Sequence, residues 1–273
     1  MTSVPGVLAH GGHAPFALIG APALPAVLLA VYLAGVVRVR RAGGRPWSGW
    51  RTAAFTAGAL CLAVALAPPV AGSAHGDFRA HMVQHLLIGM YAPLGLVLGA
   101  PVTLALRTLD ARAGRRVTGF LNLPPVHVLA HPLAALLLSA GGLYVLYATP
   151  LYAAAAANPL LHQLVHLHFL LSGCLFAWAV AGPDPAPRRP PVPFRLVVLG
   201  IAIAAHATLA QLLYAGAFAA LPADADQMRG AAEIMYYGGD IAELLLAFAL
   251  VTTWRPRRSM AVAADTARVG HGR

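Results

Sequence analysis

Seven long apolar runs constrain this chain more than any other feature of its sequence. A hydrocarbon core of about 30 Å is crossed by about 20 mostly apolar helical residues, and each run has about that length. Continuous runs predict helices, because the strands of a membrane barrel show short segments of alternating hydrophobicity instead. The sequence therefore predicts an all-α, seven-helix transmembrane domain over residues 1–254, with spans at about 16–37, 52–71, 80–105, 126–148, 160–182, 194–219 and 231–254.

The composition excludes an ordinary soluble domain. Hydrophobic residues make up 59% of the 273 positions and charged residues only 10%, so too few polar groups remain to cover a water-soluble surface. The two cysteines, Cys61 and Cys174, both lie within predicted spans. We therefore expect no disulfide framework, and a metal site outside the spans must do without thiolate ligands.

The basic residues predict the orientation of the spans. All 19 are arginines, and all but Arg79 and Arg229 follow spans one, three, five or seven. The positive-inside rule then places the amino terminus outside and the carboxyl terminus in the cytoplasm, in a multi-pass plasma membrane protein of a bacterium. Residues 255–273 form a basic cytoplasmic tail that we expect to be disordered. This distribution indicates contact with the lipid bilayer and no nucleic acid partner.

Prolines interrupt several of the apolar runs. We expect a kink or a local break at each of Pro22, Pro25, Pro93 and Pro101. The proline-dense segment GPDPAPRRPPVP, residues 182–193, is predicted to be an extended tether between spans five and six.

Four histidines form two pairs near the outer ends of spans three and five. His81 and His85 in HMVQH are four residues apart, and so are His162 and His166. Each pair projects from one face of its helix, so two facing helices could offer four imidazole nitrogens to one ion. Ionisable residues inside a membrane are costly and usually functional. A metal site is therefore favoured over the alternative, in which these histidines form interhelical hydrogen bonds or meet lipid headgroups.

The neighbouring residues indicate copper as the metal. Imidazole suits copper and zinc, whereas the thioether of methionine favours copper in its reduced state. Glu233, in the first turn of span seven, is the acid expected nearest to these histidines. Metal ligation and structural pairing are equally compatible with its position. Further candidate ligands near the same surface are Met82, Met228, Met235 and Asp226, although Met82 cannot share a face with both His81 and His85.

Two acids lie deeper in span seven. Glu233, Tyr237 and Asp240 follow i, i+4, i+7 spacing, which predicts one stripe facing the bundle. His206, near the middle of span six, lies at a depth where it could meet Asp240 as an ion pair or as part of a proton or cation path. His206, Asp240 and Glu243 thus form a predicted intramembrane polar path, and a copper or proton transporter is an alternative function.

Two other chemistries can be compared with HMVQH. The zinc peptidase motifs HExxH and HxxEH need glutamate at the second or fourth position, where this chain has Met82 and Gln84, so hydrolysis is disfavoured. Haem is an alternative cofactor in a membrane redox protein, because histidines on different helices could bind its iron axially. Pairs with i, i+4 spacing nevertheless fit a small ion better than a macrocycle.

Several stretches resemble the CtaG-like family, multi-spanning cytochrome c oxidase assembly factors associated with caa-type oxidases. The most specific is HMVQHLLIGMYAPLGLVLGAPVTLALR, from His81 to Arg107, and HPLAALLL from His131 and LHQLVHLHFLLSGCLFAWAVAGPDP from Leu161 are also similar. The segment ADQMRGAAEIMYYGGD resembles the family more loosely. The family pattern has a glycine pair followed by an aliphatic residue, Met and Trp, where this chain has Gly-Ala-Ala from residue 230 and then Tyr236.

This resemblance implies a seven-span membrane protein that is needed to make active haem-copper oxidase and that is not an enzyme. It implies that cytochrome c oxidase subunits, and copper chaperones, are the partners. A different, single-span copper chaperone shares the family's short name, but its cysteine mechanism does not transfer to a chain without cysteines outside the spans. The sequence therefore predicts an assembly factor that binds copper at its outer face.

Overall fold

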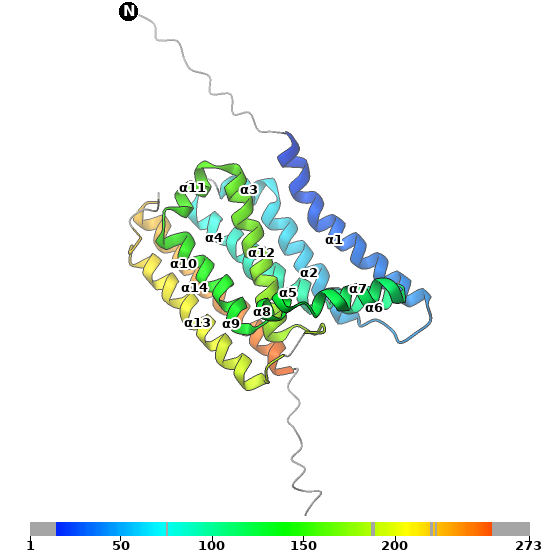
Figure 1. Cartoon of the computed structure of the whole chain (residues 1–273). Helices are drawn as coiled ribbons and strands as arrows, with labels where there is room; N and C mark the ends of the chain where they lie inside the picture. The colour runs from blue at the N-terminus through cyan, green and yellow to red at the C-terminus, as the bar shows by residue number, and fades with distance from the viewer. Residues whose placement is uncertain (1–14, 75, 187–188, 219–220, 222, 253–273) are drawn as a thin grey trace, which may run out of the picture.

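The computed structural model describes residues 15–74, 76–186, 189–218, 221 and 223–252. Among these residues every secondary-structure element is a helix, and there is no strand (Figure 1). The predicted all-α fold is therefore confirmed. The tail at residues 255–273 lies outside the described residues. The helices are α1 (Pro15–Arg41), α2 (Gly49–Leu66), α3 (Pro68–Ser73), α4 (Phe78–Leu86), η1 (Leu87–Tyr91), α5 (Ala92–Leu98), α6 (Pro101–Thr108), α7 (Ala111–Leu121), α8 (Pro124–Leu129), α9 (Pro132–Leu136), η2 (Leu137–Gly141), α10 (Gly142–Ala148), α11 (Leu151–Ala157), α12 (Pro159–Ala181), α13 (Val192–Tyr214) and α14 (Ala225–Thr252).

Six segments of the described chain are long and apolar enough to cross a membrane, and a bent pair of helices brings the number to seven when the pair is taken as one span. The six are Ala23–Arg41, Gly49–Leu66, Phe78–Thr108, Pro159–Ala181, Val192–Tyr214 and Ala225–Thr252. This pair is Pro132–Ala148 and Leu151–Ala157, with an angle of 80° between them, and its first part overlaps the fourth predicted span, 126–148. The chain runs up and down the bundle, so that α1 begins at one end and α14 finishes at the other (Figure 1).

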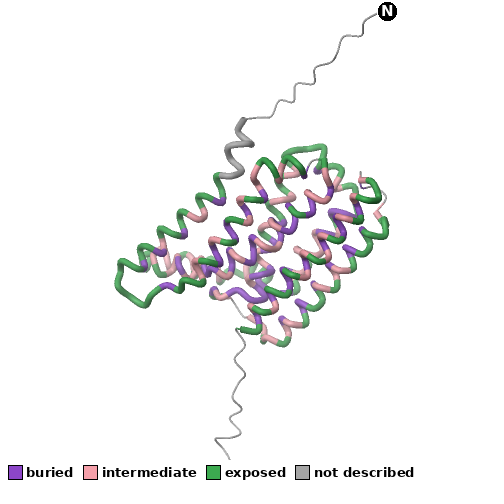
Figure 2. Tube along the Cα trace, turned by 180° about the vertical axis from the view of Figure 1, so that it is seen from behind, coloured by how far each residue is buried: buried purple, intermediate pink, exposed green. Residues whose placement is uncertain are grey.

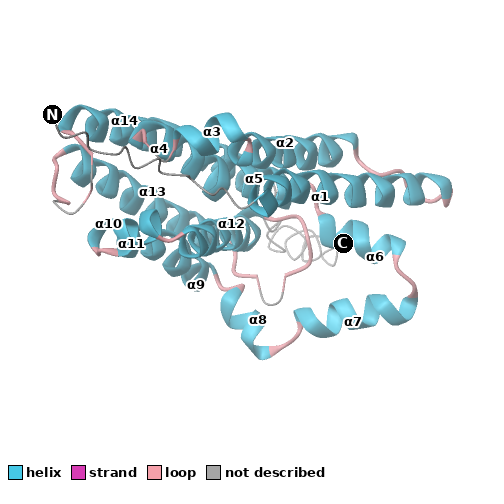
Figure 3. Cartoon of the chain, turned by 90° about the horizontal axis from the view of Figure 1, so that it is seen from above, coloured by secondary structure: helices cyan, strands magenta, loops and turns pink. Residues whose placement is uncertain are grey.

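The two ends of the bundle differ in charge. One end, which we call the arginine end, holds the loop after α1, the helices α6 to α8 and the start of α13, and it carries the described arginines that were predicted to lie on one side. Figure 3 shows α6, α7 and α8 as an arm beside the bundle, and α7 has no buried residue. The opposite end, the histidine end, is formed by α3, α11 and the first turns of α4, α12 and α14 (Figure 1).

The outward faces of the long helices are apolar. On α12, for example, the exposed residues follow helical spacing along one face: Leu160, Leu164, Leu167 and Leu171 are 70%, 52%, 47% and 58% exposed. Buried positions are concentrated on the inward faces of the central helices, whereas α1 is largely exposed at the edge of the bundle (Figure 2). Exposed leucine stripes of this length indicate a lipid environment, because soluble proteins rarely expose such large continuous apolar surfaces to water.

The prolines have different effects on the helices that contain them. α1 continues without a break through Pro22 and Pro25, so of the predicted kink or break the break is not seen there. Before Pro93 the helix widens into the π-helical segment η1, and before Pro101 it breaks at Ala100, whose φ of 53° is left-handed. A proline ring clashes with the carbonyl four residues earlier and has no N–H to donate, so a wider or interrupted turn relieves both problems.

The described residues between α12 and α13 form no helix, which agrees with the predicted extended tether, and the segment is in addition anchored to the bundle. Asp184 is buried, and its carboxylate accepts hydrogen bonds from the N–H groups of Val102 and Thr103 at 3.0 and 2.7 Å and from the Thr103 hydroxyl at 2.6 Å. A carboxylate at the start of α6 satisfies N–H groups that have no partner within the helix. Arg189 donates hydrogen bonds to the carbonyl groups of Gly182, Asp184 and Trp178 and closes the loop.

The closest helix contact on the α2 side of the bundle depends on glycine. A Cβ atom at Gly95 would lie 2.6 Å from the carbonyl oxygen of Ala54 and 2.6 Å from the amide nitrogen of Gly58. α2 and α5 therefore meet backbone to backbone. Helices in membranes commonly associate through such small residues, because lipid supplies no hydrophobic force to hold them together.

We predict that Gly95→Ala lowers the stability of the protein by about 1–3 kcal/mol, because the added methyl group forces α2 and α5 apart. The measurement is thermal unfolding of the purified protein in detergent. Gly200→Ala is the matched control: it lies in a helix with no heavy atom within 4 Å of the added Cβ. There alanine should be neutral or stabilising by up to about 1 kcal/mol. Equal effects of the two substitutions would contradict the close contact.

Asp184→Asn should also destabilise the protein, by about 1–3 kcal/mol, because an amide oxygen cannot replace both carboxylate oxygens and a buried N–H group loses its acceptor. The same unfolding measurement applies. Asp110→Asn serves as the control, since Asp110 is exposed and caps α7 by accepting one hydrogen bond from Ala113 at 2.7 Å. Asparagine caps helices as well as aspartate does. A stability loss confined to Asp110→Asn would show that the anchor at Asp184 has no importance.

Candidate metal centre

Three of the four predicted histidine ligands line one cavity at the histidine end. His81 from α4 and His162 and His166 from α12 face this cavity, which has a volume of about 60 Å³ and which we call the histidine hollow. The rings of His162 and His166 have their centroids 4.3 Å apart. The His81 ring packs between Phe78 and Tyr152, with centroid distances of 5.7 and 5.1 Å. The i, i+4 spacing on α12 thus produces a real pair of neighbouring imidazoles.

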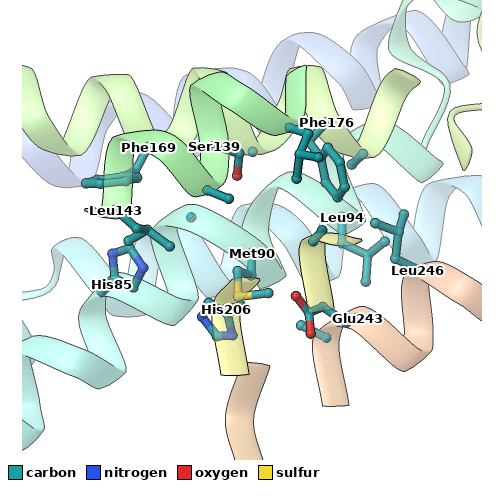
Figure 4. A pocket seen from close by; sticks show the side chains of 17 residues that line it. His85, Met90, Leu94, Ser139, Leu143, Phe169, Phe176, His206, Glu243 and Leu246 are labelled. Carbon is teal, nitrogen blue, oxygen red and sulfur yellow. The ribbon is translucent and has the colours of Figure 1, made fainter. Parts of the chain in front are cut away.

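The fourth predicted ligand, His85, lies in a different cavity. With Met90, Ser139, His206 and Glu243 it lines a deeper space between α12, α13 and α14, which we call the inner chamber (Figure 4). His85 is one helical turn further into the membrane than His81 and rotated by about 40° about the axis of α4, which is enough to bring it to the other cavity. The predicted convergence of four ring nitrogens on one ion is therefore not seen.

No preformed metal site exists among the described residues, in the sense of three or more His, Cys, Asp or Glu side chains arranged to hold one ion. Imidazole pairs and a third imidazole in the same small cavity are nevertheless ligands that copper accepts. The residues of the histidine hollow fit copper in their chemistry, and ring rotation would be needed to bring His81 to the same ion as the pair on α12.

The acidic and methionine candidates lie away from the histidine hollow. Glu233 is exposed and lines a shallow space between α13 and α14. Asp226 forms an ion pair with Arg79 at 2.6 Å on the surface. The three methionine candidates, Met82, Met228 and Met235, are buried in an apolar cluster with Phe169 and other core side chains. Spacing in the sequence alone could not show this.

The predicted inward stripe on α14 is wrong. Glu233 and Tyr237 are exposed, and Asp240 is half-buried and does not line the inner chamber. The buried face instead carries Met235, Gly239, Ala242, Glu243 and Leu246. The two faces have nearly the same helical periodicity, so spacing could identify a stripe but could not select which stripe faces inward.

The deep histidine of the polar path shares a cavity with Glu243 and not with Asp240. His206 and Glu243 are each 4% exposed and both line the inner chamber (Figure 4). The His206 ring packs directly against Gly239, where a Cβ atom would collide with it. Both ring nitrogens of His206 and one carboxylate oxygen of Glu243 are buried without a hydrogen-bond partner among the described residues. Buried polar atoms of this kind usually contact water or an ion.

Two π-helical segments border the same chamber. Gly89 and Met90 come from η1, and Ser139 and Ala140 come from η2. α12 approaches η1 closely at Gly173, where a Cβ atom would collide with the Gly89 carbonyl oxygen. Such π-helical segments within α-helices are frequent at functional sites. Met90 was not among the named candidate ligands, although in the sequence it is one of the methionines near the outer surface that favour copper.

Comparison with known proteins places this arrangement in a family. A family model described as "Cytochrome c oxidase caa3 assembly factor" matches residues 30–257. The chain belongs to the caa3 assembly factor family. The match includes every helix that carries a residue of the two cavities in this caa3 assembly factor, and the predicted resemblance is confirmed.

Relatives of this caa3 assembly factor occur in mycobacteria. An uncharacterized protein of Mycobacterium leprae is 35% identical over 257 residues, which cover 87% of this chain and 38% of that protein. An uncharacterized protein of Mycobacterium bovis is 36% identical over 197 residues, which cover 70% of this chain and 29% of that protein. The chain thus spans less than half the length of these two relatives. No solved structure matches it significantly.

Proposed function

We propose that this caa3 assembly factor binds copper in the histidine hollow and aids its delivery to the haem-copper oxidase. The main support is the pair of imidazoles of His162 and His166, with ring centroids 4.3 Å apart, facing a cavity that His81 also lines. Cytochrome c oxidase subunits would receive the metal, and copper chaperones would supply it. The protein then acts as a carrier in assembly and catalyses no turnover reaction.

A carrier must release its cargo, and the composition of the hollow suits release. No cysteine lines it, and both cysteines of the chain lie within helices of the bundle. Imidazole nitrogens hold copper less firmly than a cage of thiolates does, so exchange with an acceptor is easier. Because the three imidazoles are not arranged around a common point, loading and unloading are expected to accompany rotation of the His81 ring.

The size of the cavities favours an ion over a macrocycle. The histidine hollow and the inner chamber each have a volume of about 60 Å³. A single water needs about 10–15 Å³ by this kind of measure, so either cavity has room for an ion with a few waters. Pockets for organic ligands commonly have several hundred Å³, on the order of 300–1,000 Å³. Haem would therefore require a large rearrangement of the bundle.

We also propose that the histidine end faces the outside of the bacterial plasma membrane and the arginine end faces the cytoplasm. The support is the concentration of arginines at one end, which the positive-inside rule associates with the cytoplasm. The arm of α6 to α8 would then lie at the anionic inner surface of the bilayer, where the arginines of α7 can meet lipid phosphates.

Single-cysteine labelling tests this orientation. In a variant with Cys61→Ala and Cys174→Ala, we expect Ala153→Cys on α11 to react with a membrane-impermeant maleimide in intact spheroplasts, because it is exposed at the histidine end. Thr118→Cys on α7 should react only after lysis, because it is exposed at the arginine end. The reverse pattern would contradict the proposed orientation.

Copper binding is tested by metal analysis of the purified protein. We expect His162→Ala and His166→Ala, singly and together, to remove copper bound in the hollow, because each loses one imidazole of the adjacent pair. His168→Ala is the matched control: His168 is on the same helix but is exposed and contacts the Leu138 carbonyl oxygen at 3.1 Å, outside the hollow. It should retain the wild-type copper content.

The same variants provide a test of delivery. Cells that depend on the His162→Ala, His166→Ala protein should make less active caa-type oxidase than cells with His168→Ala, and added copper should restore part of the activity. Full oxidase activity together with an unchanged copper content in the double variant would exclude the proposed role of the hollow.

A further inference from the structure

We infer that the inner chamber is a second copper site, in which reduced copper binds His85, His206 and the thioether of Met90, with Glu243 as its counter-charge. The choice of metal rests on the proposed function, whereas the existence of a cation site rests on the chamber itself. All four side chains line one cavity and come from three parts of the fold, α4 and η1, α13, and α14 (Figure 4).

The unpartnered polar atoms in the chamber are the first reason. The His206 side chain is only 4% exposed, and neither of its ring nitrogens has a hydrogen-bond partner in the described part of the chain. One oxygen of Glu243 is in the same state. Imidazole nitrogens and a carboxylate oxygen that lack partners in an apolar interior destabilise the folded protein, because their hydrogen bonds to water are lost and not replaced. A bound cation that uses these atoms removes that destabilisation.

The donor set selects the kind of cation. Two imidazoles and a thioether are soft or borderline ligands, which reduced copper prefers and which calcium and magnesium avoid. Met90 stands out in this respect, because it lines the chamber while the methionines at 82 and 235 are packed in the apolar cluster. Figure 4 shows His85, Met90, His206 and Glu243 along one side of the chamber, with Phe169, Ser139 and Phe176 on the opposite side.

The charge balance agrees with a monovalent cation. Glu243 is the one carboxylate among the described residues that line the chamber, and no arginine is in that lining. A single positive charge beside an ionised carboxylate leaves the chamber neutral, which reduces the cost of placing an ion in a low-dielectric interior. Reduced copper carries that charge, whereas a divalent ion would leave one positive charge uncompensated.

The backbone around the chamber is also unusual in the way that binding sites often are. η1 contributes Met90 and η2 contributes Ser139, so two π-helical segments border one cavity. Pro93 has no N–H to donate to the Gly89 carbonyl four residues before it. This local weakness permits the small movements by which the ligands could close around an ion.

The two cavities share α4, since His81 lines the histidine hollow and His85 the chamber one turn deeper. The chamber would therefore receive copper from the hollow along this helix.

The test uses the full-length protein in detergent with Cys61→Ala and Cys174→Ala as background, loaded with copper under ascorbate. We expect a second copper ion per chain beyond the one in the hollow, and a copper–sulfur contribution in the X-ray absorption spectrum. Met90→Leu should remove the sulfur contribution and lower the copper content by one ion, and His206→Gln should lower the content in the same way. Met82→Leu is the matched control, because Met82 is fully buried in the apolar cluster and should change neither readout.

The outcomes separate this proposal from the proposed function. If His162→Ala, His166→Ala loses one ion but keeps the sulfur contribution, both sites exist. If the wild-type protein binds one ion, with a sulfur contribution that Met90→Leu abolishes and His162→Ala leaves intact, the chamber binds copper and the histidine hollow does not. A copper content and an absorption spectrum that Met90→Leu and His206→Gln leave unchanged, in variants that unfold at the wild-type temperature, would overturn the second site.

Discussion

The need to satisfy backbone hydrogen bonds inside a bilayer shapes the centre of this protein. In hydrocarbon every N–H and carbonyl group must find its partner within the protein, and Pro93 cannot supply one. The third span contains η1, a π-helical segment, just before this proline. Gly173 on α12 lets the neighbouring backbone come close to the Gly89 carbonyl group. This contact fixes α12 against the third span and so determines the distance between the helices that carry the histidines.

The sequence predicted the elements of the fold more completely than their faces. Hydropathy and length identified the crossings, because each continuous apolar run has one explanation in a membrane. The arginine positions identified the two ends of the bundle, because all but two of the arginines follow spans one, three, five or seven. The spacing of Glu233 and Asp240 on α14, in contrast, agreed with an inward stripe that the structure assigns to Gly239 and Glu243. Periodicity gives the angle between residues on a helix, and only packing against α13 and α4 decides which angle points inward.

For the histidine pairs too, spacing in the sequence predicted which residues share a helix face but not which cavity each residue lines. The pair on α12 remains together, because both rings face one cavity. The pair on α4 is divided, because that helix lies between two cavities and a rotation of about 40° crosses the boundary between them. The loop residue Asp184 was missed for another reason. Its partners, Val102 and Thr103, are about eighty residues away in the chain, and a break at Ala100 exposes their N–H groups. No local pattern reports such a contact.

Because His81 and His85 on α4 line different cavities, the proposed copper carrier has two sites instead of one. In the proposed mechanism, two sites of similar donor chemistry one helical turn apart would let a cation move without leaving nitrogen ligands, so the barrier between them would be lower than for release into lipid. The hollow is formed by side chains near the end of the bundle, where the rings of His162 and His166 are half-buried and can exchange ligands with another protein. The chamber is lined by Phe169, Gly173 and the buried face of α14 and lies one helical turn deeper along α4. In the proposed mechanism the deeper chamber would therefore retain copper, and the hollow near the end of the bundle would exchange it.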